Sequence, residues 1–110
     1  MDRDQSIDAL SALAHATRLD VFRLLVRAGA DGMAAGEIAD TLAVRQNTMS
    51  ANLAVLSRAG LVRAERRGRS VIYCADFEGM RGLLAFLMED CCGGNPALCQ
   101  PVLDEIACAC

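Results

Sequence analysis

The sequence has few aromatic residues and no long apolar segment, and these shortages exclude several architectures. Its 110 residues include three Phe, one Tyr and no Trp, although 54% of the residues are hydrophobic. An apolar composition with so few rings favours closely packed helices over a sandwich of aromatic strands. The longest apolar run, Leu83 to Met88, covers six residues, whereas a membrane helix needs about 20. We therefore expect one small, mainly helical protein without a membrane span.

Signals for export and for catalysis are missing as well. The N-terminus, Met-Asp-Arg-Asp-Gln, has neither the basic nor the apolar segment of a secretory leader, so we expect a cytoplasmic protein. The sequence offers no Cys-His or Ser-His-Asp set with free partners, no phosphate-binding glycine loop and no Cys-x-x-Cys motif. Its single histidine, His15, lies at a helix junction, where capping or packing is commoner than metal ligation. We expect no enzymatic activity and no catalytic cofactor.

Positive charge is concentrated in one part of the chain. The net charge is -3, and all 11 cationic side chains are arginine. Residues 41–70 contain six of these arginines and a single acidic residue, so this stretch is basic while the rest of the chain is acidic. Such a distribution is typical of a protein that meets phosphates with one face.

Apolar spacing predicts five helices, over residues 5–14, 19–27, 35–42, 46–59 and 77–88. Asp4 or Ser6 is the expected cap of the first helix and Thr17 that of the second, with a loop over residues 30–33. Strand-like runs at 61–66 and 70–75 flank an arginine-rich turn. Residues 93–96 are expected to end the last helix, and 102–107 to form a further turn or two. The expected fold is mainly α with a small β-hairpin, divided into a domain over 1–92 and a cysteine-rich tail over 93–110.

The two helices over 35–42 and 46–59 form a helix-turn-helix pattern, because only three residues separate them. Gln and Asn on an outer helix face can pair with adenine in the major groove, and an adjacent basic hairpin can lie along phosphates. Taken alone, the two helices would fit an ordinary helical hairpin, and the arginines would fit the solvated face of a strand. Taken together, the helices and the basic hairpin predict a winged helix-turn-helix DNA-binding domain. The candidate DNA contacts are Arg45, Gln46, Asn47, Thr48, Ser50, Ala51, Asn52, Arg66, Arg67 and Arg69.

Four stretches in this order strengthen that interpretation: LAHATRLDVFRLL (13–25), GEIADTL (36–42), TMSANLAVLSRAGLV (48–62) and RRGRSVIY (66–73). The set resembles the ArsR/SmtB family of winged-helix repressors over residues 8–90. The resemblance implies homodimers, joined through the first and last helices, that bind operator DNA when unliganded and leave it when a metal ion binds. Asn52 stands where the family usually has His, so the family's preference for particular DNA bases cannot be transferred to this chain. Residues 36–42 lack the family's arsenic-binding Cys-x-Cys, so the sensor must lie elsewhere.

Cysteines crowd the end of the chain, where five of the six lie in the last 20 residues. Reduced thiolates select soft ions, and trivalent arsenic or antimony takes three of them in a pyramid. Cys91, Cys92 and Cys99 meet that count and are the expected site for arsenite or antimony as inducer. The spacing of the cysteines disfavours a structural zinc site. Cys108 and Cys110 are expected to lie in a frayed terminus, and Cys74 is expected to be a core residue.

These features predict a metalloid-responsive transcriptional repressor whose partners are double-stranded operator DNA and a second copy of the chain. The second copy is expected because the apolar face over 77–88 exceeds what one small domain covers. Two alternatives stay open at this point. One is a repressor of the same fold that senses oxidants or sulfur species through vicinal thiols; the other is a cytosolic thiol protein that binds soft metals.

Overall fold

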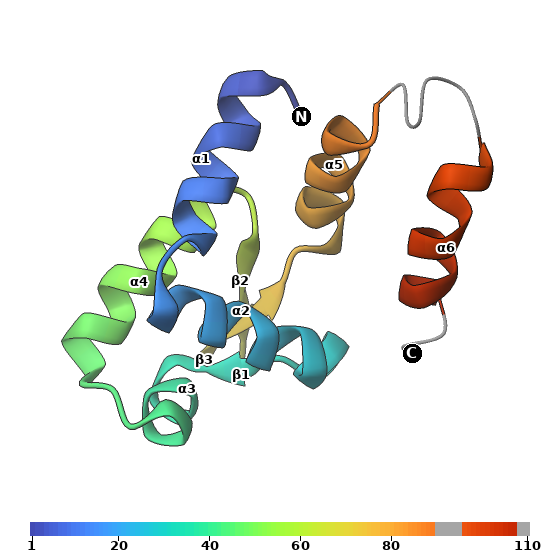
Figure 1. The fold of residues 1–110 in the computed structure, drawn as a ribbon. Coiled ribbons are helices and arrows are strands. Elements are labelled where there is room, and N and C mark those ends of the chain that lie inside the picture. Colours follow the sequence, from blue (N-terminus) through green and yellow to red (C-terminus); the bar gives the residue numbers. More distant parts are fainter. Residues whose placement is uncertain (90–95, 108–110) are drawn as a thin grey trace.

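A computed structural model describes residues 1–89 and 96–107 of the chain (Figure 1). Its elements, in order, are α1 (Arg3–Leu13), α2 (Ala16–Ala28), the 3₁₀ turn η1 (Gly29–Asp31), β1 (Met33–Ala34), α3 (Ala35–Leu42), α4 (Gln46–Arg58), β2 (Val62–Arg67), β3 (Ser70–Ala75), α5 (Phe77–Leu87) and α6 (Pro96–Ala107). The strands form one antiparallel sheet in the order β1-β3-β2. Helices dominate and β2 with β3 makes the wing, which confirms the expected fold class.

The first two helices begin earlier than the sequence predicted, because other residues cap them. The Asp2 carboxylate accepts the Gln5 N–H at 2.8 Å, and the Gln5 side chain accepts the Asp2 N–H at 2.9 Å. This reciprocal pair satisfies two amides that have no partner inside the helix. The cap of α2 is His15, whose Nδ1 accepts the Arg18 N–H at 3.4 Å, rather than Thr17. The capping role expected of His15 is thereby confirmed.

Residues 30–33 are more ordered than the loop that the sequence predicted. Met33 and Ala34 pair with Tyr73 and Ile72 on the free edge of β3. Gly32, at φ +63°, makes this approach possible: a Cβ there would lie 2.6 Å from the Ile72 side chain and from the Tyr73 carbonyl oxygen. The third strand depends on a partner about 40 residues away, which no local pattern reveals.

The hydrophobic core lies between the sheet and helices α2, α3 and α4, and it holds the middle of the chain together. Its fully buried large side chains are Val21, Leu25, Ile38, Met49, Leu53, Leu56 and Leu61. Cys74, on β3, is 1% exposed, as expected of a core residue. Residues of α2 and α3, together with Leu61 just before β2, thus fix α4 against the sheet, and the outer side of α4 is left at the surface.

The C-terminal part of the chain consists of α5 and α6, which lie side by side in Figure 1. Helix α6 begins at Pro96 and continues to Ala107, where the sequence predicted only a turn or two. Proline suits the first helical position because the amide it lacks would have no partner there. The predicted boundary between domain and tail, at residues 92 and 93, lies outside the described residues. Across 1–89 and 96–107, no helix has the length and apolar character needed to cross a membrane.

Candidate nucleic-acid interface

Helices α3 and α4 form the helix-turn-helix that the sequence predicted. Helix α3 ends at Leu42, Ala43 adopts the left-handed conformation at φ +54°, and α4 starts at Gln46. Met49, Leu53 and Leu56 face the core. The predicted DNA contacts that lie exposed around the start of α4 are Arg45, Gln46, Asn47, Thr48, Ser50 and Ala51. They share one accessible surface, as a helix that enters the major groove requires.

Asn52 does not belong to this surface, so the sequence assigned it wrongly. The residue is only 7% exposed, and its side-chain Oδ1 accepts a hydrogen bond from Arg18 Nη1 at 3.3 Å. Because a buried side chain held by a neighbouring helix cannot reach a base edge, we remove Asn52 from the candidate contacts. Helical spacing places position 52 on the same side as Met49 and Leu56, so periodicity already separated it from the exposed residues; Asn52 was included because it lies in the recognition helix among other polar residues.

The wing presents Arg66 and Arg69 to solvent. Arg67 pairs with Ser70 across the hairpin, and Gly68, at φ +63°, supplies the tight turn beside Arg69. Both Arg66 and Arg69 are exposed, and neither side chain forms a hydrogen bond or ion pair with the described part of the chain. These two guanidinium groups are therefore available to phosphates.

Arg67 has a different environment from the other wing arginines. Its Nη1 donates to the Asp31 carbonyl oxygen at 2.8 Å, and its Nη2 donates to the Ala30 carbonyl oxygen at 2.8 Å. Nη2 also lies 2.8 Å from Glu65 Oε2. The side chain ties the wing to η1, so we expect Arg67 to hold the wing in place more than to bind phosphate, and its contact with DNA stays a prediction. The acceptors are backbone carbonyls 36 and 37 residues away, which sequence inspection could not find.

Glu65 sits between two arginines on the wing. The hydrogen bond from Arg67, together with the charge of Arg63, lowers the pKa of the Glu65 carboxyl below its ordinary value. Arg63 Nε donates to Glu65 Oε1 at 3.1 Å, and the same pairing with Glu65 raises the pKa of Arg67. Glu65 therefore stays ionised near neutral pH and offsets part of the wing's positive charge. The charge that faces outward comes chiefly from Arg66 and Arg69.

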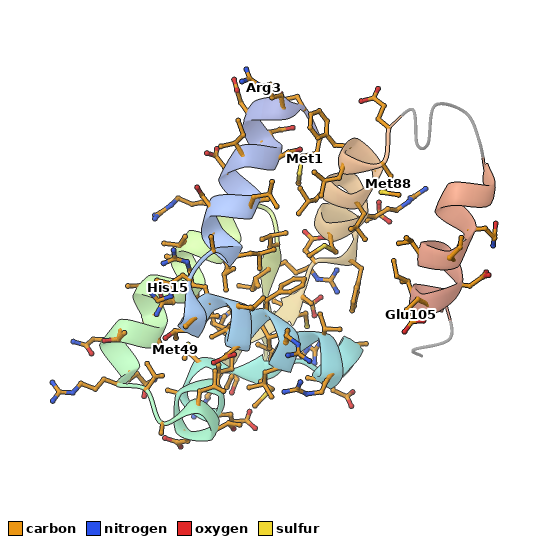
Figure 2. All side chains as sticks on the ribbon, in the orientation of Figure 1. Met1, Arg3, His15, Met49, Met88 and Glu105 are labelled. Atoms are coloured by element: carbon orange, nitrogen blue, oxygen red, sulfur yellow. The ribbon has the colours of Figure 1, made fainter. Side chains whose placement is uncertain are left out.

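The candidate metalloid ligands fall mostly beyond what the structure describes. Cys91 and Cys92 lie outside the described residues, as do Cys108 and Cys110, and Cys99 lies in α6. The three-thiol site therefore stays a prediction from the sequence. His15, the other candidate ligand type, is used as the cap of α2, and Figure 2 shows it at the corner between α1 and α2.

Comparisons with known proteins agree with this geometry. A family model described as a helix-turn-helix domain matches residues 13–65. The uncharacterized HTH-type transcriptional regulator YbzH of Bacillus subtilis is 33% identical over an alignment of 98 residues that covers 78% of this chain and 98% of YbzH. The homodimeric winged helix-turn-helix DNA-binding domain of Mb0332 from Mycobacterium bovis, a possible ArsR-family transcriptional regulator, is 31% identical with a TM-score of 0.65. That match covers 94% of this chain and 82% of the other.

The chain belongs to the ArsR family of winged helix-turn-helix transcriptional regulators. A further solved structure, of a possible transcriptional regulator for arsenical resistance, is 30% identical with a TM-score of 0.62 and covers 73% of this chain and 80% of its own. In this ArsR-family regulator, α3, α4 and the β2–β3 wing are the DNA-binding module. The part of the sequence that the family model matches ends within β2 and so includes both helices of the motif.

Proposed function

We propose that this ArsR-family regulator is a homodimeric repressor that leaves its operator DNA when trivalent arsenic or antimony binds Cys91, Cys92 and Cys99. The observation that carries the proposal is that the DNA-binding side chains and the candidate thiol ligands occupy separate parts of the chain. The exposed DNA-binding side chains lie within residues 45–69, whereas the three thiols follow α5. A ligand at the thiols can therefore change the end of the molecule without touching the surface that meets DNA.

Exposed apolar side chains support a homodimer. Phe77 and Leu87 on α5 are 52% and 50% exposed, and Ile7 and Leu10 on α1 are also exposed. These side chains lie on two helices that contact each other, and apolar surface gathered in this way is typical of an interface. In a two-fold dimer, the two copies of α4 would read half-sites of an imperfect palindrome about one helical turn apart.

The space between α5 and α6 adds to this apolar surface. A groove of about 500 Å³ lies between these helices, with Met80 and Leu84 on one wall and Val102 and Ile106 on the other. Met88 lies at the end of α5 that leads to the thiols, and it also lines the groove (Figure 2). A metalloid that draws together ligands on both sides of residues 93–98 would change the position of α6 relative to α5. An interface built on α5 would respond to that change.

The donor set accounts for the choice of inducer. Trivalent arsenic and antimony are thiophilic and complete their coordination with three thiolates, whereas a site with His and carboxylate ligands would favour zinc, nickel or cobalt. The resemblance in sequence and fold to a possible regulator for arsenical resistance supports the same choice. The coupling required is modest, because about 1 to 3 kcal/mol between the two sites lowers operator affinity roughly 5- to 150-fold.

The proposal is tested by selecting DNA duplexes from a random pool with the reduced full-length protein, then titrating the complex with arsenite. We expect a palindromic consensus, release of the selected duplex by arsenite, and thiolate charge-transfer absorbance at the same stoichiometry. Cys99→Ser should abolish or greatly weaken release by arsenite but largely spare release by a methylated trivalent arsenical, which takes two thiolates. Cys108→Ser is the matched control and should behave as the wild type.

Several outcomes would contradict the proposal. Full arsenite response in Cys99→Ser would move the third ligand to another thiol. Release by peroxide but not by arsenite would indicate the redox-sensing alternative. Failure to enrich any duplex would favour a thiol protein that only binds soft metals.

A further inference from the structure

Arg18 lies where three helices meet, and its side chain connects two of them. From α2, its Nε donates to the Ala12 carbonyl oxygen in the last turn of α1 at 2.7 Å. Its Nη1 donates to Asn52 Oδ1 on α4 at 3.3 Å. One guanidinium group therefore joins the C-terminal end of α1 to the inner side of the DNA-recognition helix, close to the His15 corner visible in Figure 2.

Both acceptors depend on this side chain. The Ala12 carbonyl belongs to the last four of α1, which have no amide partner within the helix. Asn52 is only 7% exposed as a residue, and burying its side-chain amide without a hydrogen bond would be costly. The planar guanidinium presents separate donors in a fixed fork, so it can hold two acceptors in a defined relative position. The two hydrogen bonds therefore constrain the position of α4 relative to α1 as well as adding stability.

Packing between α1 and the C-terminal half of α4 is incomplete beside this connection. A crevice of about 400 Å³ opens there, lined by Asp8 and Ser11 of α1, by Val55 and Arg58 of α4, and by Arg18 itself. Where side chains do not fill the space between two helices, a polar link has more influence on their relative orientation than it would inside a close-packed core. Arg18 supplies such a link along one edge of the crevice.

We propose that Arg18 is a positioning residue that sets the orientation of α4 relative to α1, with Asn52 as its acceptor on the recognition helix. Movement of α1 is then transmitted to α4 through the guanidinium. The inference rests on DNA binding through α4 and does not require a metalloid inducer. It also gives position 52, where the family usually has His, a role within the protein instead of at a base.

The test uses reduced full-length protein and a duplex that the wild type has selected from a random pool. Arg18→Gln and Asn52→Ala should each weaken binding roughly tenfold, the effect expected from losing one hydrogen bond to a charged group. The double variant should bind about as weakly as either single variant, because both changes remove the same link. Arg23→Gln, exposed on the same helix, is the matched control and should change selected-duplex affinity little.

Salt dependence separates positioning from a direct phosphate contact. If Arg18 positions α4, the slope of log affinity against log salt should stay at the wild-type value in Arg18→Gln, and binding to non-specific DNA should change little. A slope smaller by about one unit would show a lost phosphate contact and overturn the proposal. Wild-type affinity in Arg18→Gln would overturn it, and so would a double variant whose loss is the product of the two single losses.

Melting followed by circular dichroism establishes that each variant is folded at the assay temperature. If Arg18→Gln is not folded, Arg18→Lys takes its place, because lysine keeps the charge but loses the fork of two separate nitrogen donors. The positioning role predicts that Arg18→Lys loses affinity for the selected duplex. Retained affinity in that variant would contradict it.

Discussion

Gly79 marks a close approach between α5 and the backbone at Gly60, and replacing it with alanine is a sharp test of the packing. A Cβ at this position would lie 1.7 Å from the Gly60 carbonyl oxygen and 2.8 Å from its carbon. Real Cβ atoms essentially never approach closer than 3.0 Å, so the backbones would have to separate by at least about 1.3 Å at this point. The obstacle is backbone, which cannot rotate away as a flexible side chain can.

The cost of Gly79→Ala follows from two opposing effects. Forcing an extra methyl group into a close-packed contact costs about 1 to 3 kcal/mol, and the upper end applies where neither neighbour can relax. Alanine regains up to about 1 kcal/mol through its better helix propensity. The buried Leu83 holds α5 in place one turn later, so the helix cannot simply move outward. We expect a net loss of about 2 kcal/mol, which lowers the melting temperature by roughly 8 °C.

Gly82→Ala is the matched control on the same helix. A Cβ there would lie 3.3 Å from the Cβ of Met1, at the chain terminus, where the neighbour can yield. This variant should be as stable as the wild type or up to about 1 kcal/mol more stable. Urea unfolding at one fixed protein concentration measures both variants, since dimerisation would make stability depend on concentration. Equal stability of Gly79→Ala and Gly82→Ala would refute the reasoning.

Three further predictions concern the wing and the interface. Arg66→Ala and Arg69→Ala should each reduce the salt slope of DNA binding by about one unit. Arg67→Ala should leave the slope nearly unchanged and should instead speed amide hydrogen exchange in η1. Equal slopes in all three variants would contradict the different roles given to these arginines. The lowered pKa of Glu65 contributes stability that is present above its unfolded-state pKa and is lost as pH falls through the lower folded-state value. A carboxyl NMR titration should therefore give a midpoint below that of a free glutamate, and a midpoint at or above it would be inconsistent with the pairing. Leu84→Glu should give a monomer in sedimentation at micromolar concentration, and an intact dimer would exclude this part of α5 from the interface.

The helices, the hairpin and the helix-turn-helix were predictable because each depends on residues close together in the chain. Met49, Leu53 and Leu56 repeat at helical spacing, and the structure buries all three. Gly68 between two strand-like runs predicts the hairpin turn and adopts the positive φ that such a turn needs. Local spacing is also what carries the family resemblance, which the comparisons confirm for the helix-turn-helix.

The partners of individual polar side chains were decided only by the tertiary structure. Asn52 and Arg67 both fit a DNA-binding pattern in the sequence, yet Asn52 is held by Arg18 and Arg67 by the carbonyls of η1. Strand β1 likewise exists only because β3 offers a free edge. Periodicity reports which side of a helix or strand a residue occupies, because that follows from backbone geometry. It does not report which distant donor or acceptor lies opposite, because that depends on how the elements pack.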